Sequence, residues 1–231
     1  MMPYFLWKNT DSRTMGLWLS QYPDRVRASE RINSVSIPGR AGELVLTEGS
    51  NVYEPVRLVT RVQTVPTNDF DMLHDWLSGE GLVVFGSQPN RAWKARIQSE
   101  VAFGRISNSL LEASIQFDCE PFKRQFPAET DITMTASGSV VNIGNVEAYP
   151  VITITGSGDI VLTVNDKAFS IEDLSSKAVL DCDARMAVDN SGNNILESTD
   201  GDFPVLTVGT NTVSWTGTVT SVVITPRWRW R

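Results

Sequence analysis

The stretch Phe117-Asp118-Cys119-Glu120-Pro121-Phe122 separates two parts of this 231-residue chain that differ in character. Residues 110–117, which lead into it, alternate between apolar and polar side chains, the pattern of a half-buried β-strand. Pro121 cannot donate a hydrogen bond to a neighbouring strand and restricts the residue before it, so the strand is predicted to end there. A polar segment, residues 123–131, follows.

The two parts also differ in charge. Residues 1–126 carry 14 Lys and Arg against 14 Asp and Glu, whereas residues 127–231 carry 6 against 13, so the net charge of −7 lies in the second part. The first part contains one helical pattern, and the second contains strand patterns only. We therefore predict two domains, residues 1–126 and 127–231, each long enough to bury its own core.

Composition argues against several classes of protein. An acidic chain has few cations with which to replace the counterions of a nucleic acid, so specific nucleic-acid recognition is not expected. No apolar run reaches transmembrane length, and the first residues lack the pattern of a signal peptide, so no membrane role is expected. Cys119 and Cys182 do not make a disulfide framework; we expect two buried free thiols in a protein made in a reducing cytosol.

The first part is predicted to contain a strong strand and one helix. Residues 55–65 alternate as a strand that Pro66 ends. Residues 68–79 have apolar side chains at helical spacing, with Thr67 or Asn68 as the cap and Gly79 in the left-handed position after the last turn. Further strands are predicted at 3–8, 16–20, 82–85, 92–101 and 110–117.

Residues 27–53 predict a hairpin with little apolar surface of its own. A proline and two glycines within five residues mark its turn. A strand pair that cannot form its own core usually lies against another surface. It is either an edge hairpin of its own domain or an arm that contacts a neighbouring subunit. The candidate contact residues are Val35, Ile37, Pro38, Gly39, Arg40, Gly42, Leu44 and Leu46.

Basic residues recur on the predicted strands of the first part. One interpretation is a solvated sheet face that also carries acidic partners, and the other is a polar rim at a subunit contact. The residues concerned are Arg57, Arg61, Arg91, Lys94, Arg96 and Arg105.

The second part is predicted to be a β-sandwich, because many short strands alternate with turn signals. Among these signals are residues 156–159, Asn165-Asp166 and Thr216-Gly217. Expected strands include 150–155, 160–164, 212–215 and 221–225. The last tryptophans of the chain either meet a partner or pack on the protein, and packing is favoured. We expect a domain seam formed by Phe117, Cys119, Pro121, Phe122, Trp228 and Trp230.

The sequence contains no specific catalytic or cofactor motif. His74 is the one histidine, it lies within the predicted helix, and no GxSxG or phosphate-binding loop accompanies it. Asp181, Asp183 and Asp189 flank strands and turns, where solvated acids are common. A calcium site at residues 181–183 or 200–202 would use clustered oxygens, but the spacing is not specific. We therefore predict no enzyme, no cofactor and no metal, and favour a structural or binding module.

Several stretches, in this order, cover nearly the whole chain: Ser36–Leu44 (SIPGRAGEL), Phe117–Phe122 (FDCEPF), Asn142–Pro150 (NIGNVEAYP), Val164–Lys167 (VNDK), Leu180–Cys182 (LDC) and Phe203–Asn211 (FPVLTVGTN). As an ordered set they resemble the distal tail protein (Dit) family of long-flexible-tailed phages and prophages of Gram-positive bacteria. The position of Ala41 is often acidic in that family, and the change is not expected to alter the turn.

This resemblance implies a mainly β fold with two domains. The first would be a β-sandwich or barrel-like domain with one α-helix and a long hairpin arm, assembling as a hexameric ring. The second would be a galectin-like β-sandwich of jelly-roll type outside the ring.

The resemblance also implies a structural virion protein at the distal end of the tail. As a hub it would join the tail tube to the tail tip or baseplate and let DNA pass. The implied partners are further copies of the chain, the tail tube (major tail) protein, a tail-tip lysin or fibre protein and the tape-measure protein. Its place would be the virion tail tip, after synthesis in the cytoplasm of the bacterial host.

The alternative function is carbohydrate binding, with the second domain acting as a host-surface adhesion module. A sugar site needs an exposed aromatic platform and clustered polar groups. The second part has few aromatic residues and no evident pair among them: Tyr149, Phe169, Phe203, Trp215, Trp228 and Trp230. In the family resembled, members that bind saccharides carry extra modules, and this chain has no large insertion in its second part.

Overall fold

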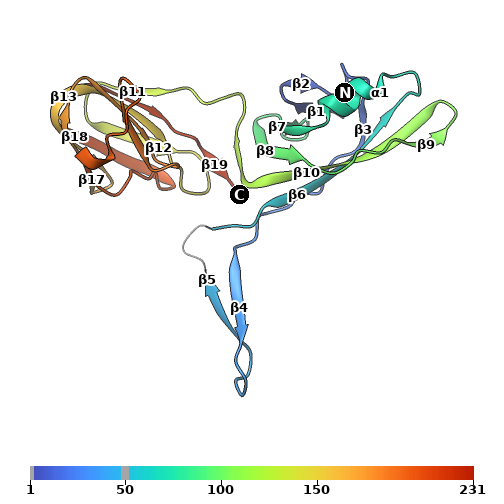
Figure 1. Ribbon diagram of the computed structural model, residues 1–231, viewed down its shortest axis with the longest axis horizontal. Coiled ribbons are helices and arrows are strands. Elements are labelled where there is room, and N and C mark those ends of the chain that lie inside the picture. The colour runs from blue at the N-terminus through green and yellow to red at the C-terminus, as the bar shows by residue number, and fades with distance from the viewer. Residues whose placement is uncertain (1–2, 48–51) are drawn as a thin grey trace. The chain divides into compact units, whose positions relative to one another are not determined.

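The computed structural model describes residues 3–47 and 52–231 (Figure 1). The described chain is mainly β with one α-helix, which confirms the predicted fold class. It folds into two compact units: unit 1 is Met1–Phe126 with Arg231, and unit 2 is Pro127–Trp230. Each unit has its own hydrophobic core.

Unit 1 is built on an antiparallel sheet. Its strands are β1 (Phe5–Trp7), β2 (Thr10–Asp11), β3 (Trp18–Gln21), β6 (Val56–Thr64), β7 (Gly79–Phe85), β8 (Arg91–Ile97), β9 (Gly104–Ser107) and β10 (Leu110–Gln125). They follow the order β2-β1-β7-β8-β10-β6-β3, and β9 pairs with β10. The amide of Leu19 in β3 donates to the carbonyl of Pro3 before β1 (3.4 Å), so the sheet curls and its two ends approach each other.

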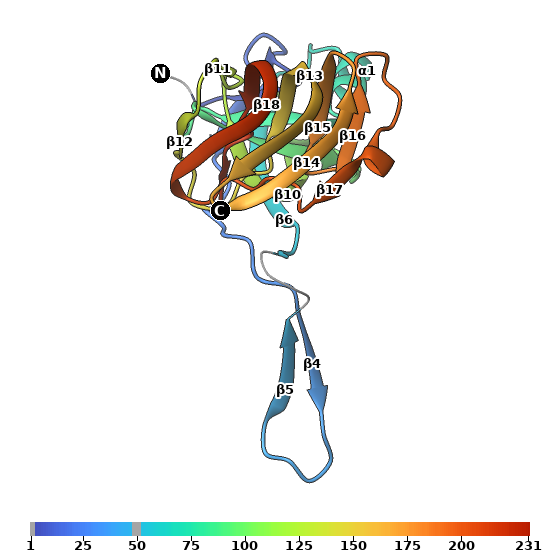
Figure 2. The ribbon, with the colours of Figure 1, turned by 90° about the vertical axis from the view of Figure 1, so that its left-hand side faces the viewer.

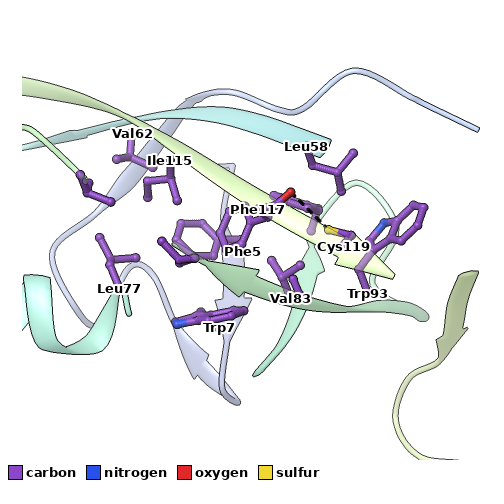
Figure 3. Close-up of a cluster of buried hydrophobic side chains, with 14 of the residues drawn as sticks. Phe5, Trp7, Leu58, Val62, Leu77, Val83, Trp93, Ile115, Phe117 and Cys119 are labelled. Atoms are coloured by element: carbon purple, nitrogen blue, oxygen red, sulfur yellow. Dashed lines mark hydrogen bonds between the residues drawn. The ribbon is translucent and has the colours of Figure 1, made fainter. Parts of the chain in front are cut away.

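Apolar side chains on the inner face of this sheet form the core of unit 1 (Figure 3). Strand β6 alternates between buried and more exposed residues along its length, as predicted. The ring of Phe117 lies 5.8 Å from that of Phe5 and 5.4 Å from that of Trp7. The indole of Trp7 donates to the carbonyl of Trp76 (2.8 Å), which ties the helix to this cluster.

The helix α1 (Phe70–Trp76) is shorter than residues 68–79. Asp69 is the cap, and its carboxylate accepts from the amide of Met72 (3.0 Å). Asn68 does not cap the helix, because its side-chain oxygen accepts from the amide of Asp69 (3.0 Å), before the helix begins; its amide group donates to the carbonyl of Met15 (2.9 Å) and to a threonine hydroxyl. Gly79 has a φ of +68°, but it opens β7 instead of closing the helix.

Strand β10 does not end at Pro121, so that prediction was wrong. The strand continues to Gln125, and its register against β8 shifts between Cys119 and Lys123. Pro121 lies within this irregularity. Proline is tolerated at such a point, because a bulged residue does not have to donate to the ladder.

Unit 2 contains two long strands and several shorter ones (Figure 2). They are β11 (Ile132–Met134), β12 (Gly138–Asn142), β13 (Val151–Val164), β14 (Lys167–Leu174), β15 (Lys177–Asp181), β16 (Met186–Asp189), β17 (Thr199–Gly201), β18 (Gly209–Thr225) and β19 (Arg229–Trp230), with a 3₁₀-helix η1 (Leu196–Ser198). β18 pairs with β11, β12 and β13, and β13 also pairs with β14 and β15; β16 pairs with β15 and β17 with β14.

Strands β13 and β18 are each continuous, which corrects the prediction of four shorter strands. The glycines that predicted turns lie in register shifts between the two strands. A Cβ on Gly156 would lie 2.3 Å from the carbonyl oxygen of Thr218, and a Cβ on Gly217 would lie 2.3 Å from that of Asp159. Glycine is therefore needed here for close backbone approach at bulges and not for chain reversal.

Because both long strands bend, each contributes to two halves of unit 2. Residues 151–155 pair with β15 and with residues 221–225, whereas residues 161–164 pair with β14 and with residues 213–216. The core takes buried side chains from both halves. The two halves of unit 2 therefore enclose one core, the arrangement of a β-sandwich.

Two buried asparagines hold loops of the stretches that carry the family resemblance. Asn142 donates to the carbonyls of Val146 and Leu206 (both 3.0 Å) and accepts from the amide of Gly144 (2.8 Å). Asn211 accepts from the amide of Thr207 and donates to its carbonyl (both 2.8 Å). From a buried position, each side chain satisfies backbone groups of its loop.

Candidate assembly surfaces

The predicted hairpin arm consists of β4 (Ile32–Ser36) and β5 (Glu43–Thr47). Among the described residues, these two strands pair with each other and with no other strand. The turn between them contains Gly39 and Gly42 at φ of +84° and +81°, where the sequence predicted it. Every residue from Ile32 to Leu46 is exposed except Leu44, which is half-buried.

The two faces of the arm are not equivalent. In antiparallel strands, residues directly opposite each other share a face. Val35 is opposite Leu44, and Leu46 is opposite Asn33, so these side chains share one face with Ile37 beyond the strand end. The other face carries Ile32 and Val45 among serines and Glu43. The predicted contact residues Val35, Ile37, Leu44 and Leu46 thus form one apolar face, here called the arm face.

The base of the arm is fixed by polar contacts. Glu30 and Tyr53 form an isolated β-bridge. Arg31 donates to a carboxylate oxygen of Glu54 (2.9 Å), and the guanidinium of Arg231 lies 4.6 Å from the ring of Tyr53. The predicted hairpin, residues 27–53, also includes residues 48–51, which lie outside the described chain.

The outer face of the sheet of unit 1 carries a row of alternating charges. Glu80, Arg96, Asp118 and Arg57 stand opposite one another on four neighbouring strands, β7, β8, β10 and β6. Arg96 forms an ion pair with Glu80, and Arg57 lies 3.2 Å from Asp118. Two more pairs share one carboxylate: Lys94–Glu120 (2.7 Å) and Arg124–Glu120 (3.0 Å). Three of the six basic residues predicted on these strands, Arg57, Lys94 and Arg96, therefore have acidic partners, as the interpretation of a solvated sheet face requires.

Two of the four domain-seam residues of β10 lie in the core of unit 1. Phe117 and Cys119 are buried, and the Cys119 thiol donates to the carbonyl of Phe117 (3.6 Å; Figure 3). Burial raises the pKa of this thiol to about 12. Pro121 and Phe122 are half-buried, and the ring of Phe122 meets that of Tyr53 edge-on at 5.4 Å.

The other two domain-seam residues belong to unit 2. Trp228 is 5% exposed and is part of the core of unit 2, and Trp230 is half-buried against that core. The tail of the chain therefore packs on the protein at these residues. A joint role of all six residues at a domain boundary stays a prediction.

The aromatic side chains of unit 2 do not form an open platform. Each of the six, named above for the carbohydrate hypothesis, is buried or half-buried. Phe203 leans on Phe169 with ring centroids 4.9 Å apart, and the guanidinium of Arg229 lies 4.4 Å from the ring of Tyr149. This arrangement does not favour a sugar site, which needs an accessible aromatic face.

The candidate acids of unit 2 serve local structure. Asp181 binds the guanidinium of Arg227 and accepts from the amides of Asp183 and Ala184. Asp189 accepts from the side chain and amide of Asn193, which lowers the pKa of its carboxyl group. Within the described residues, no three His, Cys, Asp or Glu side chains gather as a metal site.

His74 lies on the exposed side of α1. Its ring meets that of Phe103 edge-on at 5.7 Å, the packing expected of a residue at the boundary of a buried helix. In the part of the chain that the structure describes, no helix has the length and apolar character needed to cross a bilayer.

Comparisons with known proteins agree with this fold. No family model matches the chain, and no curated protein matches it. Among solved structures, it is similar to the SPP1 Dit (gp 19.1) protein, described as a paradigm of the hub adsorption apparatus in phages infecting Gram-positive bacteria. The TM-score is 0.75 at 15% identity, over 100% of each chain. The chain therefore has the fold of the Dit protein of SPP1, in agreement with the family resemblance of its sequence.

Proposed function

We propose that this chain is a structural protein at the distal end of a phage tail. It assembles as a hexameric ring that joins the tail tube to the tail tip or baseplate, and the opening of the ring lets DNA pass. The similarity to a hub protein over the whole length of both chains supports this role.

The observation that carries the proposal is the exposure of the arm face. Val35 and Leu46 are 46% and 50% exposed, although both are apolar and stand on a two-stranded element that pairs with no other described strand. Such a strand pair is marginally stable by itself and needs a surface to cover it. A contact between the arm of one copy and the body of the next repeats by rotation and closes into a ring if the angle permits.

The charge of the chain supports the same arrangement. Residues 1–126 are neutral, so copies of unit 1 can stand close together, whereas residues 127–231 carry the net charge of −7 and repel their own copies. We place unit 1 in the ring and unit 2 outside it. Tail tube, tail-tip and tape-measure proteins are the partners that such a hub would contact.

The mass of the protein in solution tests the role of the arm. Residues Asn33–Leu46 are removed, and Ile32 is joined to Thr47 by a short glycine linker, because these two residues are opposite each other in register. The intact protein is expected to form hexamers, alone or with its tail tube protein, and the shortened protein is expected to be a folded monomer. A shortened protein that still forms hexamers would contradict the proposal.

A further inference from the structure

Three cationic side chains converge on a small cavity of unit 1. The cavity has a volume of about 70 Å³. Arg25 comes from the segment before the arm, Arg91 from the start of β8, and Lys123 from β10 beyond its register shift. These residues are far apart in the sequence, so the fold alone brings their charges together.

Three buried apolar side chains form one wall of the cavity. Leu58, Phe85 and Trp93 belong to the core of unit 1 and line the cavity. The ammonium group of Lys123 lies 5.4 Å from the centre of the Trp93 ring, over which it is held. The cavity therefore offers positive charge beside an aromatic wall.

Positive charge exceeds negative charge on the lining. Three cations face one carboxylate, that of Asp24. No carboxylate oxygen of a described residue lies within 4.0 Å of the charged nitrogens of Arg25 or Lys123, so neither side chain forms an ion pair there. Burial lowers the pKa of Lys123, and the nearby charges of Arg91 and Arg25 lower it further. The pKa of Arg91 is also lowered by burial. Like charges held together in this way are stabilised by an anion between them.

The size and walls of the cavity restrict the anion. On the scale at which about 10–15 Å³ holds one water molecule, the cavity has room for several waters and therefore for a carboxylate group. A carboxylate is planar and accepts the paired N–H groups of arginine. The apolar wall would contact the methylene groups of an aspartate or glutamate side chain, which a free inorganic anion lacks.

We propose that this cavity binds the carboxylate of an acidic side chain presented by a partner polypeptide. The site does not depend on the arm face or on ring formation, because none of its cations lies on β4 or β5. It gives unit 1 a second contact, electrostatic in character, next to the segment that leads into the arm.

Lysine NMR tests the proposal on the full chain. The five lysines, Lys8, Lys94, Lys123, Lys167 and Lys177, are converted to ¹³C-dimethyl-lysine, which keeps its positive charge and one N–H donor. The signal of Lys123 is assigned from its loss in Lys123→Arg. The probes are acetyl-Ala-Glu-Ala-amide, the matched acetyl-Ala-Gln-Ala-amide, and inorganic phosphate.

The Glu peptide is expected to shift the Lys123 signal saturably and leave the other four unchanged, and the Gln peptide is expected to shift none. Arg91→Gln should weaken the response about tenfold, equivalent to about 1.4 kcal/mol, while Arg185→Gln, at an exposed residue between β15 and β16 of unit 2, should not change it. Circular dichroism verifies that both variants are folded, and Arg25→Gln replaces Arg91→Gln if that variant unfolds. A response to phosphate but not to the Glu peptide, equal responses to both peptides, or no response would overturn the proposal.

Discussion

Asp181 and Arg227 form a two-point ion pair within unit 2, with 2.9 Å between Oδ1 and Nη1 and 3.0 Å between Oδ2 and Nη2. Asp181 ends β15, and Arg227 follows β18 and precedes the buried Trp228. The hydrogen bonds from Arg227 hold the pKa of the Asp181 carboxyl group below its usual range. The pair therefore fixes the last segment of the chain on the sandwich.

Asp181→Asn is expected to lower the melting temperature at pH 7 by about 2–4 °C, which corresponds to about 1 kcal/mol. Asparagine still accepts from the amides of Asp183 and Ala184, so the variant isolates the ion pair. Because the pKa of Asp181 is lowered on folding, the pair stabilises above the unfolded pKa of about 4 and is lost as the pH falls through the folded value. The difference between variant and parent in thermal melts should therefore vanish at low pH. A difference that is constant from pH 7 to pH 3 would contradict this assignment.

Trp228→Ala is expected to destabilise unit 2 by about 3–5 kcal/mol, because it removes a large buried side chain and leaves a cavity. Urea unfolding followed by circular dichroism measures the loss. Met186→Ala, at a residue that is 50% exposed, is the control and should change the stability by less than about 0.5 kcal/mol. Equal, small effects of both substitutions would mean that the end of the chain is not packed.

Cys119 and Cys182 are expected to be free thiols that react slowly in the folded protein. Both are buried, and burial raises the pKa of each to about 12. The reactive thiolate is then about one in ten thousand at pH 8, compared with about a quarter for an exposed cysteine. Iodoacetamide without reductant should add twice in denaturant and very slowly under native conditions, as read by intact mass. Fewer than two additions in denaturant would show that a thiol is oxidised.

Gly156→Ala is expected to destabilise unit 2 by roughly 1–3 kcal/mol, because its Cβ would lie 2.3 Å from the carbonyl oxygen of Thr218, a backbone atom that cannot turn away. Gly138→Ala is the matched control in the same unit, since the nearest atom to its Cβ is the mobile end of Met134 at 3.2 Å. Urea midpoints compare the two. If Gly156→Ala is no more harmful than Gly138→Ala, the close approach of β13 and β18 is wrong.

Local patterns in the sequence predicted much of the fold. The alternation of residues 55–65 predicted β6, and the glycines and proline of residues 38–42 predicted the arm turn. Apolar residues at helical spacing predicted α1, although its cap is Asp69. These features depend on neighbours in the chain, so sequence alone can specify them.

Features that depend on distant residues were not predictable in the same way. A proline ends a regular strand, but Pro121 lies at a register shift against β8, where the strand can continue. That shift depends on residues far away in the chain. Gly156 reads as a turn glycine, and only pairing with β18 shows that it permits close approach. The charged cavity was missed because Arg25, Arg91 and Lys123 come from separate segments, and no spacing in the sequence signals them.

The two faces of the arm allow the most direct test of the central claim, which is that the arm face makes the contact between copies. Val35→Thr with Leu46→Thr makes the arm face polar, and Ile32→Thr with Val45→Thr does the same to the opposite face at similar exposure. Threonine keeps the β-propensity of the strands, so the arm should form in both variants.

The measurement is the mass of each protein by light scattering after size exclusion, alone and mixed with its tail tube protein. We expect hexamers for the parent and for Ile32→Thr with Val45→Thr, and monomers for Val35→Thr with Leu46→Thr. Hexamers in both variants, or a parent protein that stays monomeric even with the tail tube protein, would contradict the account.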